Sequence, residues 1–137
     1  MFNALDISAS GLVAQRVRQE LIAKNVANAQ STKAGADSAG RPIPYRRQFA
    51  VFMSQADGQG RPAGVRVAEV AEDPGEGRKV FDPRHPHAGP DGYVRYPNVD
   101  LNTELPDMME ATRAYEANIT AMDATKAMMS ADLRLLA

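Results

Sequence analysis

The two histidines are the side chains best suited to chemistry in this sequence. His85 and His87 flank Pro86, and the carboxylates Asp82 and Asp91 lie within a few residues of them. Imidazole and carboxylate are both zinc ligands, but a zinc site needs three or four protein ligands, and the chain has no cysteine and no third histidine. A metal-dependent enzyme is therefore the least favoured function, and we expect a turn or local-contact role for both histidines.

Other catalytic patterns are missing from the sequence. It contains no G-x-S-x-G, P-loop or G-x-G-x-x-G string, and a Ser-His-Asp triad would have to be built on the same proline-rich turn. Arg46 and Arg47 follow Tyr45, a combination that RNA-binding proteins use, but in an amphipathic strand such a pair is more typical of a solvated face. We expect no catalytic residue, no cofactor and no bound metal.

Length and composition narrow the class of protein further. A chain of 137 residues with 44% hydrophobic and 6% aromatic residues forms one small domain with little aromatic mass in its core. The net charge of -1 gives no basic excess for nucleic acid or anionic lipid. The start, MFNALDISAS, lacks the basic and apolar regions of a signal peptide, and no apolar run approaches the roughly 18 residues of a membrane span. We therefore expect no cleavable signal, no membrane insertion and no small-molecule substrate.

Turn-forming residues divide the chain into three segments. All nine prolines and nine of the ten glycines lie between Gly35 and Pro106. Since these residues weaken helices, the two ends are free to form long helices and the middle favours turns and short strands. We predict an α+β fold with an N-terminal helix in residues 1–30, a β-rich middle with a flexible connector in 31–98, and a C-terminal coiled-coil helix in 99–137.

The C-terminal segment carries the clearest periodicity. Alternating steps of four and three residues from Leu101 meet a large apolar side chain at all but two positions over five heptads, which is typical of a coiled coil. With Thr103 as the N-cap, Pro106 would fall in the first turn, where a missing N–H is tolerated. The predicted assembly seam consists of Leu105, Met108, Tyr115, Ile119, Met122, Met129, Leu133 and Leu136.

The N-terminal segment shows two weaker apolar stripes. Helices this rich in alanine bury little against one another, so the extra stripes indicate contacts with other chains, with a plain intramolecular coiled coil as the alternative. Asn28 and Asn118 lie on secondary stripes, where a buried amide can fix helix register. The residues predicted to pack the N-terminal helix are Leu5, Leu12, Val17, Leu21 and Val26.

Alternating residues in the middle segment predict two hairpins. The first pairs residues 45–53 with 65–68 across the turn DGQG, and the second pairs 79–81 with 93–96 around residues 83–92. The string STKAGADSAGRP between the first helix and the first strand is expected to be a flexible connector.

Several strings of the sequence carry a family resemblance. KNVANAQST is similar to the Asn-rich signature of bacterial flagellar axial proteins, the rod, hook and hook-associated subunits. PYRR, FDPRHP, GYVRYPNVD, RAYEAN and KAMM then follow in order and resemble the basal-body rod proteins of the proximal rod. Pro106 departs from that pattern. The positions that carry the resemblance include Asn25, Asn28, Tyr45, Arg46, Pro83, Gly92, Tyr93, Pro97, Asn98 and Asn118.

The resemblance implies a structural role in motility. Such subunits pair their terminal helices as a coiled coil, stack helically around an export channel with themselves and other rod subunits, and carry torque from the motor. They leave the cytoplasm uncleaved through the flagellar type III export apparatus, which places the rod in the periplasm of a double-membraned cell. Another flagellar axial subunit, or a small secreted coiled-coil assembly protein, is the alternative, and the string GYVRYPNVD separates these possibilities.

Overall fold

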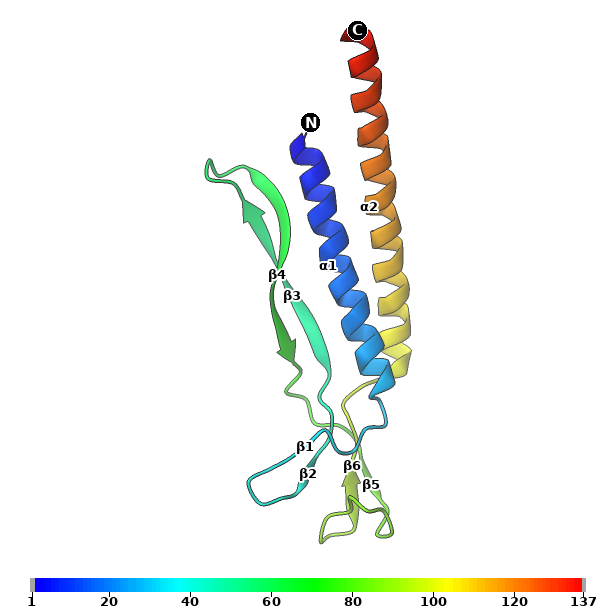
Figure 1. The fold of residues 1–137 in the computed structure, drawn as a ribbon. Helices are drawn as coiled ribbons and strands as arrows, with labels where there is room; N and C mark the ends of the chain where they lie inside the picture. Colours follow the sequence, from blue (N-terminus) through cyan, green and yellow to red (C-terminus); the bar gives the residue numbers. More distant parts are fainter. Residues whose placement is uncertain (1, 137) are drawn as a thin grey trace. The chain divides into compact units, whose positions relative to one another are not determined.

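The computed structural model describes residues 2–136 and shows two helices joined by three small strand pairs (Figure 1). The α+β expectation is confirmed. The elements in chain order are α1 (Phe2–Ala27), β1 (Gly35–Ala36), β2 (Pro42–Ile43), β3 (Gln48–Ala56), β4 (Pro62–Glu72), β5 (Lys79–Phe81), β6 (Tyr93–Arg95) and α2 (Leu101–Leu136). Among these described residues, no helix has the length and apolar character needed to cross a bilayer.

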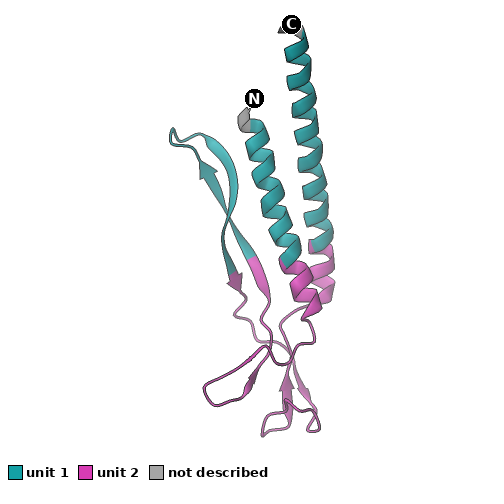
Figure 2. Ribbon diagram, viewed as in Figure 1, with its two compact units in different colours: residues 1–20, 50–70, 108–137 teal, residues 21–49, 71–107 magenta. Residues whose placement is uncertain are grey.

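Two compact units make up the chain, and each combines pieces of all three sequence segments (Figure 2). Unit 1 contains residues 1–20, 50–70 and 108–137, and unit 2 contains residues 21–49 and 71–107.

In unit 1 the two helices lie side by side and antiparallel. Arg18 forms an ion pair of 3.0 Å with Glu110, while Gly11, further toward the N-terminus, lies against Asn118. The β3–β4 hairpin is attached to α1 because the Val65 N–H donates to Ser10 Oγ at 3.0 Å. A side chain at Gly64, whose φ is +122°, would overlap that serine.

The buried side of α2 keeps a 3.5-residue period but differs from the predicted stripe. The predicted positions Met108, Tyr115, Met122 and Met129 are all half-buried. The column beside them is Glu104, Ala111, Asn118 and Thr125 rather than Leu105, Thr112, Ile119 and Lys126. Leu105, Ile119 and Leu133 are exposed in the chain, at 57%, 39% and 67%. Leu136 is the helix's last residue, and its side chain lies outside the described residues.

The start of α2 corrects one expectation. Asp100, not Thr103, is the N-cap: its Oδ1 accepts the Asn102 N–H at 3.0 Å, and its carbonyl accepts the N–H of Glu104 at 3.0 Å. Pro106 therefore lies inside the helix rather than in its first turn. The interior position removes one backbone donor from the helix.

Both predicted hairpins are confirmed. β3 pairs with β4, and β5 pairs with β6 in the register Lys79↔Arg95, Val80↔Val94 and Phe81↔Tyr93. β3 begins at Gln48, however, so Tyr45, Arg46 and Arg47 precede the strand instead of belonging to it.

The expected flexible connector contains structure. β1 and β2 form an antiparallel pair within it, closed by a turn of sequence DSAGRP at residues 37–42. Asp37 Oδ1 accepts the N–H groups of Ala39 and Arg41 at 2.9 and 2.8 Å, and Gly40 has φ +74°. The turn between β3 and β4, DGQGRP at 57–62, repeats this pattern of bonds from Asp57, with Gly60 at φ +76°. A shared D-x-x-G-R-P sequence thus makes both turns.

Candidate functional site

The most densely bonded group of side chains lies in unit 2, around the end of α1 and the start of α2. We call it the polar cluster: Asn25, Tyr45, Arg47, Gln48, Asn98, Glu104 and Asp107. Asn25 and Glu104 are 1% and 0% exposed, so neither is solvated by bulk water. Burial of this kind is costly unless every polar atom finds a partner.

Asn25 uses its full hydrogen-bonding capacity. Its Nδ2 donates to the Gln48 carbonyl at 2.8 Å and to Glu104 Oε2 at 3.1 Å. Its Oδ1 accepts the Tyr45 hydroxyl at 2.8 Å and the Gln48 N–H at 2.9 Å. Two donated and two accepted bonds are all that an amide side chain can make, so Asn25 joins α1, α2 and the segment before β3.

Glu104 carries the buried negative charge of the polar cluster. Arg47 Nε donates to Glu104 Oε1 at 2.5 Å, and its Nη2 lies 3.5 Å from Asp107 Oδ2. The Arg47 guanidinium therefore lies between two carboxylates in the first turns of α2 and gives the buried Glu104 a cationic partner. A negative charge near a helix N-terminus is also stabilised by the helix dipole.

Asn98 connects the polar cluster to the next segment of unit 2. Its Oδ1 accepts the Arg47 N–H at 2.9 Å, and its Nδ2 donates to the Asp73 carbonyl at 3.4 Å. The Asp73 N–H in turn donates to the Arg47 carbonyl at 2.8 Å. The side chain of Asn98 therefore bridges two backbone segments beyond the ends of β3 and β4.

The surroundings of Tyr45 in the polar cluster change the pKa of its hydroxyl. Burial raises the pKa of the Tyr45 hydroxyl, and the negative charges of Glu104 and Glu72 raise it further. The phenol therefore stays a neutral donor to Asn25 over the ordinary pH range.

The polar cluster is arranged for cohesion rather than for catalysis. Its buried donors and acceptors are engaged with one another, leaving none directed at a substrate. No nucleophile is paired with a base in it, which acyl or proton transfer would require.

The two histidines form hydrogen bonds within unit 2, and the bond of His87 is long-range in sequence rather than local. His87 Nδ1 lies 2.7 Å from the hydroxyl of the buried Thr32, and His85 Nδ1 accepts the His87 N–H at 3.0 Å. Within the described part of the chain, no three His, Cys, Asp or Glu side chains lie close enough together to hold a metal ion.

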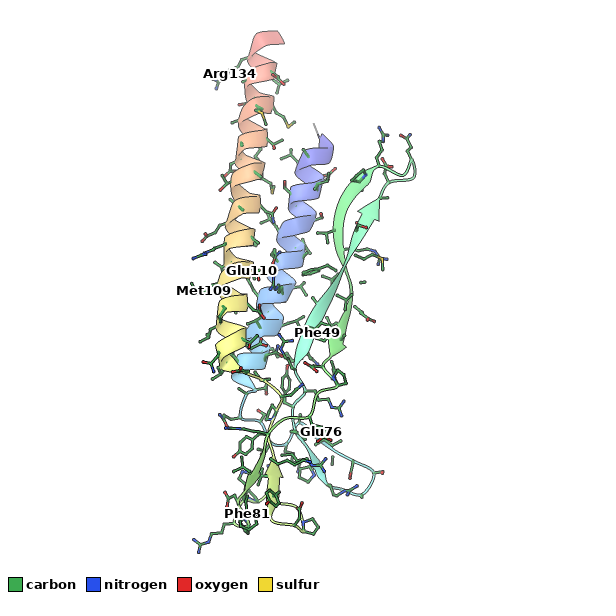
Figure 3. The ribbon with its side chains drawn as sticks, turned by 180° about the vertical axis from the view of Figure 1, so that it is seen from behind. Phe49, Glu76, Phe81, Met109, Glu110 and Arg134 are labelled. Carbon is green, nitrogen blue, oxygen red and sulfur yellow. The ribbon has the colours of Figure 1, made fainter. Side chains whose placement is uncertain are left out.

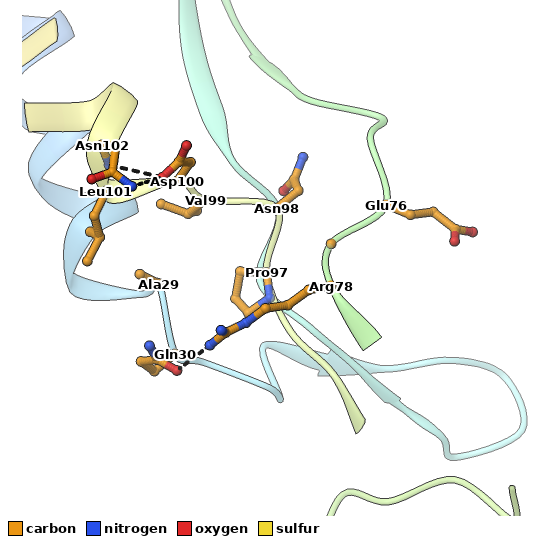
Figure 4. A pocket seen from close by; sticks show the side chains of 11 residues that line it. Ala29, Gln30, Glu76, Arg78, Pro97, Asn98, Val99, Asp100, Leu101 and Asn102 are labelled. Carbon is orange, nitrogen blue, oxygen red and sulfur yellow. Dashed lines mark hydrogen bonds between the residues drawn. The ribbon is translucent and has the colours of Figure 1, made fainter. Parts of the chain in front are cut away.

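A cleft of about 490 Å³ opens beside the start of α2 (Figure 4). Its walls include the N-cap Asp100, which holds Asn102, and Arg78, which donates to Gln30 at 3.4 Å and stacks 4.7 Å from the Tyr96 ring. These groups are engaged with one another, and the cleft contains neither histidine.

The positions singled out from sequence divide among several roles. Asn25, Tyr45 and Asn98 come together in the polar cluster, and Pro97 is buried next to Asn98. Asn28 Nδ2 donates to the Lys24 carbonyl at the end of α1. Gly92 has φ +75°, and a side chain there would meet Phe81 and Pro83. The remaining members are Arg46, which is exposed, Tyr93, which packs edge-on against Phe81, and Asn118, which lies against Gly11.

The five residues predicted to pack the N-terminal helix, Leu5, Leu12, Val17, Leu21 and Val26, are all half-buried. Among the side chains of α1 that the structure describes, the buried apolar ones are Ala14 and Ile22.

Sequence reasoning missed Arg47 and Glu104. Arg47 was expected on a solvated face, but its side chain is 23% exposed and bound to a fully buried acid. One signal was available for Glu104, which stands seven residues before Ala111 and fourteen before Asn118, in the column that faces inward.

Comparison with known proteins explains why cohesion dominates this site. Residues 91–135 match the family model described as Flagellar basal body rod FlgEFG protein C-terminal. The chain is 40% identical to Flagellar basal-body rod protein FlgC of Bacillus subtilis, with 98% of the chain and 97% of that protein aligned. The chain belongs to the FlgC family of flagellar basal-body rod proteins.

Relatives of the same name occur in distant bacteria. The FlgC proteins of Yersinia enterocolitica and Aquifex aeolicus are 40% and 41% identical, over 98% and 92% of this chain and 97% and 90% of theirs. As a FlgC-family member the chain is a structural rod protein of the flagellar basal body and not an enzyme.

Proposed function

We propose that the chain is a proximal-rod subunit that assembles helically, with itself and other rod subunits, around the export channel and transmits motor torque. Support comes from its 40% identity to a FlgC protein over nearly the whole of both chains. In this proposal α1 and α2 pair as a coiled coil, and the predicted seam of α2 meets neighbouring subunits. The chain leaves the cytoplasm through the type III export apparatus without a cleaved signal and functions in the periplasmic part of the basal body.

Exposed apolar side chains on α2 support assembly. Met109, Met128 and Leu133 are 58%, 57% and 67% exposed, and Figure 3 shows Met109 on the side of α2 away from α1. In an assembly, neighbouring subunits would bury these side chains, and removing their apolar surface from water would stabilise the contacts.

The length of α2 supports the same conclusion. Gly11 lies against Asn118, and two paired antiparallel helices have the same rise per residue. The first residues of α1 therefore lie opposite about residue 127 of α2. The last turns of α2, with Leu133, extend beyond α1 within unit 1 (Figure 2). A neighbouring subunit would cover them.

The test is motility rescue in a flagellated strain that lacks its own FlgC. We expect the wild-type chain to restore swimming and Leu133→Asp to abolish it, since an assembled interface would bury an unpaired charge. Ala117→Asp places the same charge at an exposed position on the opposite side of α2 from Leu133, outside the last turns, and should swim. Met122→Asp should fail as well, because Met122 is half-buried in the chain itself.

The histidines provide the opposite arm of the experiment. His85→Ala combined with His87→Ala should leave swimming nearly normal, since both side chains form single hydrogen bonds outside the polar cluster and outside α2. Swimming of Leu133→Asp together with failure of the double histidine variant would contradict the proposal and indicate a chemical site in the middle segment.

A further inference from the structure

A second and larger recess of unit 2 borders the polar cluster, sharing Tyr45 and Asn98 with it. This groove, of about 650 Å³, is lined on one side by the β1–β2 hairpin and the residues after it, and on the other by β5, β6 and the loop between them. Its volume is in the range of sites that bind ligands or side chains of a partner. Tyr45, Tyr93 and Tyr96 contribute aromatic surface to it.

Only some of the positive charges that line the groove are paired with acidic side chains. Two of its four cations have acidic partners: Arg41 binds Asp37 at 2.8 Å, and Lys79 lies 3.3 Å from Glu76. The other two, Arg46 and Arg95, are exposed, and neither side chain bonds to any described residue. Asp91 is the remaining acid of the lining, so the groove keeps a positive excess.

One of these cations occupies an unfavourable position. Arg95 stands directly opposite Lys79 in the β5–β6 register. Like charges that face each other across strands are destabilising, and a pair of three-residue strands has little stability to spare. An anionic partner in the groove would turn this repulsion into attraction.

The chain itself offers a surface of matching chemistry. Residues 100–137 hold seven acidic and three basic residues, the reverse of the groove. Glu116 and Asp123 stand seven residues apart, and therefore on one face of α2, with the 39%-exposed Ile119 between them. Neither carboxylate is paired with a described residue. Two unpaired acids flanking an apolar side chain complement two unpaired arginines beside an exposed tyrosine.

We propose that the groove of one copy receives the Glu116–Asp123 face of α2 from a second copy. This inference rests on the assembly proposed above and specifies which surfaces meet. Because the two surfaces differ, the contact is heterologous, which is the kind of contact that can build an open helical array.

Charge reversal tests the contact in the same motility assay. Reversing the groove with Arg46→Glu and Arg95→Glu, or the helix with Glu116→Arg and Asp123→Arg, should each reduce swimming strongly. The quadruple variant restores opposite charges and should recover most of the swimming. The matched controls are Arg84→Glu, an exposed cation absent from the groove lining, and Asp132→Arg, on the other side of α2; both should swim.

Two results would overturn the docking proposal while leaving the rod function intact. One is normal swimming by both double variants, and the other is a quadruple variant no better than either double. The neutral pair Arg46→Gln and Arg95→Gln removes the two positive charges without adding negative ones. Circular dichroism of each purified variant shows whether a loss of swimming comes from a lost contact or from a failure to fold. Failure of the wild-type chain to restore swimming would instead count against the proposed function.

Disulfide trapping gives a readout independent of swimming, because the chain has no cysteine of its own. Purified Tyr93→Cys mixed with purified Ile119→Cys at high concentration should give a linked heterodimer under mild oxidation. Tyr93→Cys mixed with Asp132→Cys is the control and should give much less. Equal yields in the two mixtures would overturn the proposal.

Discussion

The two units differ in how they treat polar and apolar groups. In unit 2, buried Asn25 and Glu104 are fully bonded by their own chain. In unit 1, the ion pair between Arg18 and Glu110 is exposed, a kind of contact worth at most about 1 kcal/mol, and the buried Gln15 Oε1 has no partner among the described residues. The interior of unit 2 is therefore held by strong buried bonds of its own chain, whereas the cited polar contacts of unit 1 are weak or unmade.

Loss of Asn25 should break this contrast most severely. Asn25→Leu leaves the Tyr45 hydroxyl, the Gln48 N–H and one Glu104 oxygen without partners, and we expect it to lower the free energy of unfolding by roughly 2–5 kcal/mol. Urea denaturation measures the loss, and hydrogen exchange should locate it in residues 21–49 and 71–107.

Asn28→Leu is the control for that experiment. Asn28 donates to the Lys24 carbonyl at an exposed position and accepts the Ser31 hydroxyl, and neither bond involves a buried charge, so its replacement should lower stability by about 1 kcal/mol, less than that of Asn25. Equal losses from the two asparagines would show that the polar cluster is not what holds unit 2 together.

Glycines in the two units should respond differently to alanine. A side chain at Gly77 of unit 2 would overlap the backbone of Tyr96 and Pro97, and we expect Gly77→Ala to lower the free energy of unfolding by about 1–3 kcal/mol. At Gly11 of unit 1 the new methyl group would meet only the movable amide of Asn118, 3.0 Å away. Since alanine favours helix by about 1 kcal/mol over glycine, Gly11→Ala should be neutral or slightly stabilising.

Thermal denaturation of both variants checks this prediction. A Gly11→Ala protein that unfolds at lower temperature than Gly77→Ala would mean that the helix contact in unit 1 is the tighter of the two.

The smallest expected effect is a pH dependence confined to unit 2. The pKa of Tyr45 is raised in the folded chain, so the neutral phenol is the form that folding favours. Its stabilising contribution is complete below the ordinary tyrosine pKa of 10.0 and declines as pH rises through the higher folded value.

Tyr45→Phe removes this dependence. Above pH 10.0 the wild-type chain should lose stability more steeply than Tyr45→Phe, as measured by denaturation midpoints at each pH. Parallel slopes for the two proteins would show that Tyr45 does not titrate differently in the folded and unfolded states.

Sequence periodicity predicted the elements better than it predicted the faces. The pairing of β5 with β6 followed from the two strand-like strings on either side of the Asp91-Gly92 turn, and the heptad period of α2 was recognised. The inward column of α2 was not, because Glu104, Asn118 and Thr125 are polar residues turned inward while Leu105 and Ile119 are turned outward. A pattern that assigns apolar residues to the interior cannot separate a chain's own core from a surface kept for assembly.

Only some members of the polar cluster could be predicted from the sequence. Asn25, Tyr45 and Asn98 were marked by family strings, but nothing in those strings shows that Arg47 and Glu104 complete the bonding. The β1–β2 hairpin was missed although its turn repeats the D-x-x-G-R-P sequence of the turn that was recognised. Attention to that internal repeat would have found it.

The repeated turn has a practical consequence. Each of the two loops begins with an aspartate, Asp37 or Asp57, whose carboxylate accepts the N–H groups two and four residues later. Gln59, at the tip of the second loop, is exposed. A reporter attached there, such as a short epitope or a fluorophore, would sit on a six-residue turn that is closed by hydrogen bonds among its own residues. Subunits could then be counted during flagellar growth with a label whose attachment site belongs to neither the polar cluster nor α2.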